Sequence, residues 1–196
     1  HDVGGPTANF TRLSCKKAET QGMCPGKRCL APKPCPNLIV DHSKYLESLR
    51  ALRKMPGVKK VFVRSGVRYD YAVLDQDDTF IQELACYHTS GQMKVAPEHC
   101  SGRVLNLMGK PSIAVYEKFK KKFEDASRRA GKRQHVLPYF ICSHPGSTLE
   151  DAIELAEYLN KSGFIPDQVQ DFYPTPSTIS TCMYYTGIDP RTGESV

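Results

Sequence analysis

The sequence predicts an α/β fold in which parallel strands alternate with helices. Apolar segments of strand length recur along the chain, and segments with helical periodicity separate them. Parallel strands need long crossover connections, and the repeat of about 30–45 residues matches the length of one strand–helix unit. The 196 residues are enough for one domain with a hydrophobic core of its own.

Five segments have the apolar spacing of amphipathic helices. The first follows a capping residue, Asp41, and ends at Pro56-Gly57. The last begins with a capping-box pattern, in which Thr148 stands three residues before Asp151, and ends at Gly163. The apolar residues that mark these helices are, in order, Tyr45, Leu46, Leu49 and Leu52; Phe80, Ile81, Leu84 and Ala85; Val104, Leu105 and Met108; Tyr116, Phe119, Phe123 and Ala126; and Ala152, Leu155, Ala156 and Leu159.

Five segments are predicted to form strands: the first residues of the chain, 59–64, 93–96, 135–142 and 167–172. Each is followed by polar, proline or glycine residues. Because parallel α/β folds bind their ligands at the carboxyl ends of the strands, five such endings predict a ligand-lined rim. The endings are Gly4-Gly-Pro-Thr7, Arg64-Ser-Gly-Val-Arg68, Ala96-Pro-Glu-His99, Ser143-His-Pro-Gly-Ser147 and Tyr173-Pro-Thr-Pro176.

The net charge of +6 is concentrated in two basic runs, 118–122 and 128–133, on and just after one predicted helix. Such runs usually form a solvated helix face, and an RNA- or phosphate-binding patch over 112–133 is the alternative. No aromatic residues are interleaved within the runs at a spacing that is typical of a base-stacking platform.

No apolar run approaches the ~20 residues that are needed to span a bilayer, so no membrane segment is expected. The eight cysteines come without an export signal, which is typical of proteins in a reducing compartment. We therefore expect a cytoplasmic protein whose thiols bind metal or are buried.

Four of the cysteines, Cys15, Cys24, Cys29 and Cys35, lie in a loop over 10–40 that contains several prolines and has no helical pattern. So long a loop is unusual in a compact domain unless something fixes it. Four thiolates can bind zinc tetrahedrally or hold an auxiliary iron–sulfur cluster, although paired CxxC spacings are missing. Disulfides formed by oxidation and free thiols are the alternatives.

Taken in order, these segments resemble the radical SAM enzymes, and more narrowly the YgiQ-type family of uncharacterised radical SAM proteins. The resemblance covers almost the whole chain and implies a partial, open barrel of parallel strands that binds S-adenosylmethionine (SAM). The segments that carry it are Asp2-Val-Gly-Gly-Pro-Thr-Ala-Asn9, Cys15 to Cys35-Pro36, Asp41-His42, Lys59-Lys-Val-Phe-Val-Arg-Ser-Gly-Val-Arg-Tyr-Asp70, Lys94-Val-Ala-Pro-Glu-His99, Tyr139-Phe-Ile-Cys-Ser-His-Pro-Gly146, Gln168-Val-Gln-Asp-Phe-Tyr-Pro-Thr-Pro176 and Met183-Tyr-Tyr-Thr-Gly187.

The resemblance implies SAM-binding residues at the strand ends. The glycine motif at 4–6 would bind the amino group of SAM through backbone carbonyls, and Glu98 would contact the ribose or the methionine. Residues 141–146 would lie beside the adenine. The turn after the last strand would lie near the adenosyl group. Taken alone, Glu98 is equally consistent with a salt bridge and His144 with a helix cap, and Arg68 is more typical of a structural role. The implied SAM-binding residues are Gly4, Gly5, Pro6, Arg68, Glu98, Ile141, His144, Gly146 and Pro174.

The radical SAM pattern is incomplete in one respect. These enzymes hold a 4Fe–4S cluster with three cysteines, usually spaced CxxxCxxC, whereas the first cysteine spacings here are C-x8-C, C-x4-C and C-x5-C. In this family the motif lies just upstream, on the loop after the first strand. We therefore expect a core that lacks its first strand–helix unit, is inactive alone and self-associates through an unpaired strand edge.

The expected function of the complete protein is cleavage of SAM by a one-electron reductant. This reaction yields methionine and a 5′-deoxyadenosyl radical, which abstracts hydrogen from an unknown substrate; RNA is one candidate. Two alternatives come from other functional classes. One is an RNA-binding module that uses the basic residues of 112–133, and the other is a structural zinc domain built on the four loop cysteines.

Overall fold

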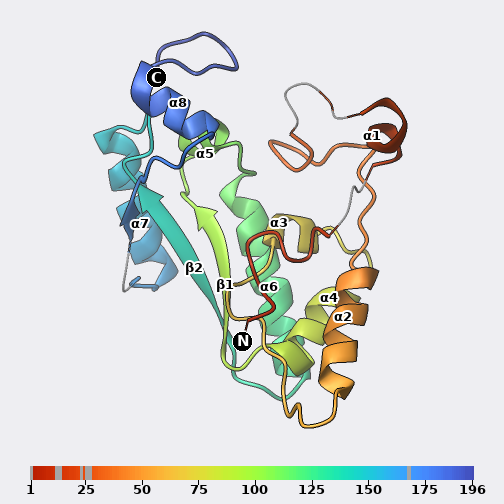
Figure 1. Cartoon of the computed structure of the whole chain (residues 1–196). Coiled ribbons are helices and arrows are strands. Elements are labelled where there is room, and N and C mark those ends of the chain that lie inside the picture. The colour runs from red at the N-terminus through yellow and green to blue at the C-terminus, as the bar shows by residue number, and fades with distance from the viewer. Residues whose placement is uncertain (1, 12–14, 23, 25–27, 167–168) are drawn as a thin grey trace. The chain divides into compact units, whose positions relative to one another are not determined.

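The computed structural model describes residues 2–11, 15–22, 24, 28–166 and 169–196 (Figure 1). The chain divides into two compact units. Unit 1 comprises His1–Cys24, Cys35–Ala96 and Ala114–Pro138, and unit 2 comprises Pro25–Pro34, Pro97–Ile113 and Tyr139–Val196.

The predicted α/β fold is confirmed, with an open parallel sheet of three strands among the described residues. β2 and β3 run parallel, with Ile141 opposite Gln170 and Cys142 opposite Asp171. β1 and β2 begin in unit 1 and end in unit 2. The strands, in their order across the sheet, are β1 (Gln92–Glu98), β2 (His135–Cys142) and β3 (Gln170–Asp171).

The sheet has fewer strands than the five expected. The first described residues of the chain and 59–64 are not strands. In these segments the side chain of Asp2 makes hydrogen bonds to the backbone. Its Oδ1 accepts hydrogen bonds from the backbone N–H groups of Gly4 at 2.8 Å and Arg64 at 2.9 Å. β3 is shorter than the expected 167–172, and the first two residues of that segment lie outside the described part of the chain.

Unit 1 is held together by the apolar faces of its helices. The predicted helices are confirmed in α2, in α4 with the π-helix η1, and in α6. α1 lies within the segment expected to be an irregular loop; it is short and buries no residue. Fully buried side chains include Tyr71, Phe80, Phe119 and Phe123. The helices are α1 (Lys16–Gln21), α2 (Ser43–Lys54), α3 (Tyr69–Ala72), α4 (Thr79–Glu83), η1 (Leu84–His88) and α6 (Ile113–Arg129), whose first residue belongs to unit 2.

Unit 2 contains α5 (Gly102–Met108), α7 (Leu149–Ser162) and α8 (Ile179–Thr186). The predicted capping box is confirmed, since the backbone N–H of Thr148 donates to Oδ2 of Asp151 at 2.8 Å. α8 was not predicted, because it buries a single residue, Met183, and shows no clear apolar stripe. The core contains Cys100, Phe140 and Leu155, with Ile113, Tyr158 and Leu159 packed against them. No helix in the described ranges is long and apolar enough to cross a bilayer.

Candidate functional site

Unit 2 contains a pocket of about 440 Å³ at the carboxyl ends of the three strands, hereafter the strand-end pocket. Its volume is within the range of ~300–1,000 Å³ that is typical of small-molecule sites. The structure thus brings together three residues implied for SAM binding, Glu98, Ile141 and His144. The lining residues are Glu98, Met108, Tyr139, Ile141, His144, Gln170, Asp171, Phe172, Tyr173, Thr175, Thr178 and Ser180.

At the ends of two strands, residues other than glycine have backbone conformations that favour glycine. Glu98, the last residue of β1, has a φ of 69°, and Ser143, directly after β2, has a φ of 58°. Non-glycine residues in this region cost conformational energy and cluster at functional sites. Oε1 of Glu98 lies 2.9 Å from Nζ of Lys110. Glu98 therefore forms the salt bridge that the sequence allowed, and it also lines the pocket.

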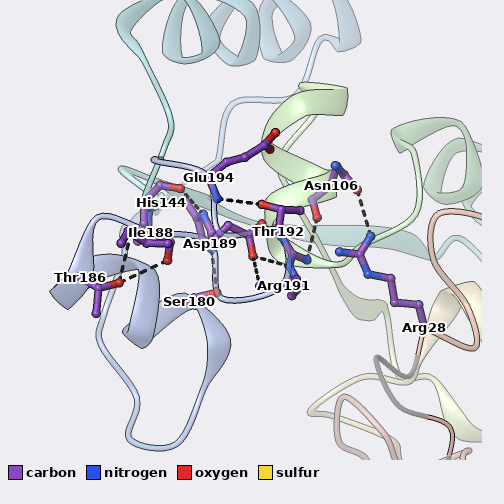
Figure 2. Close-up of polar contacts among 11 residues, drawn as sticks. Arg28, Asn106, His144, Ser180, Thr186, Ile188, Asp189, Arg191, Thr192 and Glu194 are labelled. Carbon is purple, nitrogen blue, oxygen red and sulfur yellow. Dashed lines mark hydrogen bonds and ion pairs between the residues drawn. The ribbon is translucent and has the colours of Figure 1, made fainter.

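His144 is buried and both of its ring nitrogens have partners. Nδ1 lies 2.9 Å from the carbonyl oxygen of Pro145, and Nε2 lies 2.8 Å from Oγ of Ser180 (Figure 2). Burial lowers the pKa of His144, so the ring is neutral near pH 7. A carbonyl can only accept, so Nδ1 carries the proton and Nε2 accepts from the Ser180 hydroxyl. The side chain joins the turn after β2 to α8, and it does not cap a helix.

Asp171 supplies a second carboxylate to the strand-end pocket. Its Oδ1 lies 3.1 Å from Sγ of Cys142 and 3.3 Å from Oγ of Ser143. Burial raises the pKa of the Cys142 thiol, and the hydrogen bond to Asp171 raises it further. The thiol is therefore protonated at neutral pH and donates to the carboxylate. Together with Glu98, Asp171 makes the pocket suited to cations and to ligands that carry hydroxyl donors.

Several pocket residues are absent from the set implied for SAM binding, although Tyr173 belongs to a strand ending that was predicted to line the rim. Gln170, Asp171, Phe172 and Tyr173 end or follow the last strand, and that position in a parallel sheet was the signal that could have identified them. Pro174 does not line the pocket, although the residues on either side of it do.

Gly146 is a glycine for a packing reason. Its φ is 81°, and a Cβ at this position would lie 2.7 Å from Cδ1 of Leu107 and 3.3 Å from Cβ of Val196. Its carbonyl oxygen accepts a hydrogen bond from Arg103. Gly146 is not among the residues that line the strand-end pocket.

Polar contacts fix the last segment of the chain, 186–196 (Figure 2). Nε and Nη2 of Arg191 lie 2.8 and 2.6 Å from the two carboxylate oxygens of Asp189, and these bonds hold the pKa of Asp189 at about 2. Nη1 of Arg191 donates to the carbonyl of Asn106 at 3.2 Å, and Arg28 donates to the side chain of Asn106 at 3.2 Å. The segment is thereby tied to α5.

The other residues implied for SAM binding lie in unit 1, namely Gly4, Gly5, Pro6 and Arg68. The N–H of Gly5 donates to the carbonyl of Gly66 at 2.8 Å, and the carbonyl of Gly5 accepts from the N–H of Ala8 at 3.1 Å. The motif is therefore part of a tight turn, and one of its carbonyls already has a partner within the protein.

Arg68 has structural partners on both its side chain and its backbone. Nε and Nη2 lie 3.0 and 3.2 Å from the two carboxylate oxygens of Asp70, which is buried. The N–H of Arg68 donates to Oδ1 of Asn9 at 2.6 Å, and Nδ2 of Asn9 donates to the Arg68 carbonyl at 3.1 Å. These contacts favour the structural interpretation of Arg68.

The four loop cysteines are all at least partly exposed. Cys24 is exposed, and Cys15, Cys29 and Cys35 are partly exposed, all four with free thiols. In the part of the chain that the structure describes, no group of three or more His, Cys, Asp or Glu side chains is arranged to hold a metal ion. Cys29 belongs to unit 2 and the other three loop cysteines belong to unit 1, so metal binding by this loop stays a prediction.

Comparison with known proteins gives one domain match and several longer relatives. Residues 167–195 match a domain of unknown function, DUF3362. Over all 196 residues the chain is 58% identical to a UPF0313 protein of Clostridium botulinum (strain Okra / Type B1) and 58% identical to one of Clostridium perfringens (strain 13 / Type A). The chain spans 30% of the length of each of these relatives. No solved structure matches the chain.

Proposed function

We propose that this chain is part of a radical SAM enzyme built on a partial, open barrel, and that its strand-end pocket binds the adenosyl group of SAM. The similarity to much longer UPF0313 proteins is consistent with a role within a larger protein. One observation carries the proposal. Glu98, Ile141 and His144, which the resemblance assigns to SAM binding, lie at the ends of β1 and β2 and line the same pocket.

The chemistry of the pocket suits a positively charged nucleoside. The ribose hydroxyls of SAM are donors, and the carboxylates of Glu98 and Asp171 accept hydrogen bonds. The sulfonium of SAM is a cation, which the carboxylates of Glu98 and Asp171 attract. Ile141 and Phe172 supply apolar and aromatic surface that an adenine ring can contact.

His144 has a positioning role in this proposal. Its neutral ring holds the turn after β2 against Ser180 of α8 and so shapes the pocket. Because burial lowers its pKa, the ring adds no positive charge that would repel the sulfonium. The residues of this chain would bind and orient SAM and exclude water from its adenosyl end.

A 4Fe–4S cluster, when bound, supplies the electron that cleaves SAM in this class of enzyme. The sequence contains no CxxxCxxC motif, and the described residues hold no group of three metal-binding side chains. The proposal therefore assigns the cluster ligands to another part of the full-length protein.

The test is SAM binding to the full-length protein, measured by equilibrium dialysis, for the wild type and two matched variants. Asp171→Asn removes a pocket carboxylate, and Glu157→Gln removes an exposed carboxylate that pairs with Lys161 on α7. Loss of one hydrogen bond to a charged group costs about 1.5–3 kcal/mol, so Asp171→Asn should weaken SAM binding roughly 10- to 100-fold. Glu157→Gln should leave it unchanged. Equal affinity in the two variants, or no SAM binding by the wild type, would contradict the proposal.

A further inference from the structure

Unit 1 contains a second pocket, of about 520 Å³, that is strongly basic. It lies where α2 ends, where η1 leads into β1, and where α6 leads into β2. Five of its lining side chains are basic, namely Arg53, Lys59, Lys60, Lys132 and Arg133, and none is acidic. The other lining residues are Phe62, Cys86, Tyr87, Thr89, Ser90 and Gln134. This basic pocket takes no part in the function proposed above.

The charge of the basic pocket is largely unneutralised. Among the described residues, no carboxylate forms an ion pair with Lys59, Lys60 or Arg133, and all three side chains are exposed. Lys132 differs, because its Nζ donates to the carbonyls at the end of η1, including that of Ala85 at 3.0 Å. Several free cations around one hollow attract anions, and the phosphate group is the commonest biological anion that they bind.

Two atoms of the lining residues are buried without a hydrogen-bond partner in the described part of the chain, Nη1 of Arg53 and Oε1 of Gln134. The orientation of the Gln134 amide is fixed, since its Nε2 donates to the carbonyls of Ala85 at 3.1 Å and Thr89 at 2.7 Å. Gln134 itself is only 6% exposed. Because buried polar atoms are nearly always paired, a ligand that accepts from Arg53 and donates to Gln134 fits both atoms.

Aromatic rings are interleaved with the cations. The guanidinium of Arg53 lies 3.9 Å from the ring centre of Tyr87, and Nζ of Lys60 lies 5.9 Å from the ring centre of Phe62. Tyr87 is 53% exposed, so part of its ring is open to a further partner. Basic side chains combined with open aromatic rings are typical of sites for single-stranded nucleic acid, where phosphates meet cations and bases stack on rings.

We propose that the basic pocket binds single-stranded nucleic acid. Lys59, Lys60 and Arg133 contact phosphates, and a base stacks on Tyr87. A base amine or a ribose hydroxyl donates to Oε1 of Gln134. A simple anion would contact only the basic side chains, and the ring of Tyr87 would contribute nothing to its binding.

This site differs from the basic helix face that the sequence suggested. Lys132 and Arg133 belong to the second basic run, but residues 118–122 of the first run do not line the pocket. The aromatic rings come from positions 62 and 87, far from either run in the sequence. The two sites can therefore be separated by mutation.

The first test is fluorescence anisotropy of a labelled single-stranded RNA of about 12 nucleotides with the full-length protein over a range of salt concentrations. The double variant Lys59→Ala/Lys60→Ala removes two pocket cations. The matched control, Lys118→Ala/Lys121→Ala, removes two exposed cations from α6. We expect the pocket variant to bind at least about tenfold more weakly, with a salt slope shallower by about 1.4, and the control to change little. Equal losses in both variants would place binding on a different surface and overturn the proposal.

The second test separates nucleic acid from a simple polyanion. Tyr87→Leu removes the stacking ring and keeps the charge, with Tyr185→Leu, an exposed tyrosine of unit 2, as control. Tyr87→Leu should weaken RNA binding about tenfold and leave inorganic polyphosphate binding unchanged. Circular dichroism melts of each variant verify folding. If folded Tyr87→Leu binds RNA as the wild type does, the pocket recognises charge alone and the proposal is wrong.

Discussion

Gly4 packs directly against Val63. A Cβ at Gly4 would lie 2.8 Å from Cγ1 of Val63 and 3.0 Å from the carbonyl oxygen of Gly66. At Gly5 an added Cβ would meet only Cβ of Ala8, at 4.0 Å. The two glycines, which form one motif in the sequence, are therefore under different constraints. Gly4 is required by packing within the protein. Gly5 has open space beside it, but its φ of 159° is one that residues with a side chain rarely adopt.

The first prediction concerns stability. Gly4→Ala should lower the melting temperature by several degrees, because overpacking costs about 1–3 kcal/mol and each kcal/mol shifts a domain of this size by about 2–4 °C. Gly91→Ala, at a glycine with open space around it and no positive φ, should melt close to the wild type. Thermal unfolding followed by circular dichroism measures both. Identical melting of the two variants would show that the segment around Gly4 shifts freely.

The second prediction concerns SAM. In the full-length protein, Gly5→Val should lower SAM affinity by roughly one to two powers of ten. In the glycine-motif site that the radical SAM resemblance implies, the branched side chain would intrude where a backbone carbonyl approaches the ammonium group. A side chain at Gly5 meets no close neighbour but strains the backbone at a φ of 159°, so Gly5→Ala is the control for backbone strain. The measurement is SAM titration beside the optical spectrum of the cluster, which should not change. Unaltered affinity in a folded variant would mean that the glycines serve only the turn.

Local sequence signals predicted the helices well. The capping box of Thr148 and Asp151 and the apolar stripe of α6 depend on residues three or four apart, so each signal is complete within its own segment. The first two predicted strands are not strands in the structure, and the contact that joins these two segments is non-local. Asp2 reaches across to the backbone of Arg64, and nothing near either residue in the sequence signals that contact.

The two pockets show the same limit of prediction from the sequence. The strand-end pocket could be predicted in outline, because strand order places Glu98 and Ile141 at neighbouring strand ends. The basic pocket could not, since Phe62 and Tyr87 join the cations only in the folded chain. A search for aromatic residues within the basic runs was therefore bound to miss them.

The third prediction concerns metal. Any iron or zinc that copurifies with the chain should disappear in the double variant Cys24→Ser/Cys29→Ser, because thiolates are the preferred ligands of both metals. Elemental analysis by mass spectrometry measures the content, and Cys182→Ser, outside the loop, is the control. Metal that survives the double change would exclude the loop as the site.

The fourth prediction concerns acid. Burial lowers the pKa of four histidines, His42, His88, His99 and His144. In the unfolded chain each titrates near 6.5, so below about that pH the unfolded state binds more protons than the folded state. The free energy of unfolding therefore falls as the pH drops from 7 to 5, by at most about 1.4 kcal/mol per histidine per pH unit.

Carboxylates do not account for a loss of stability between pH 7 and pH 5. Hydrogen bonds hold the pKa values of Asp2 and Asp151 at about 2 against the opposing effect of burial, and Asp189 is likewise at about 2. Their contribution is complete above their unfolded value of about 4 and is lost only as the pH falls below it. Urea unfolding at pH 7 and pH 5 should therefore report the histidines.

His42 allows this explanation to be tested at one residue. Its ring stacks on Phe80, with centroids 4.1 Å apart, and meets Tyr71 edge-on at 4.7 Å. His42→Phe preserves an aromatic ring at this position and removes the proton-binding group, so the difference in stability between pH 7 and pH 5 should shrink. His135→Phe, at an exposed histidine, should leave that difference unchanged. If His42→Phe loses as much stability on acidification as the wild type does, protonation of this buried ring does not drive the acid sensitivity.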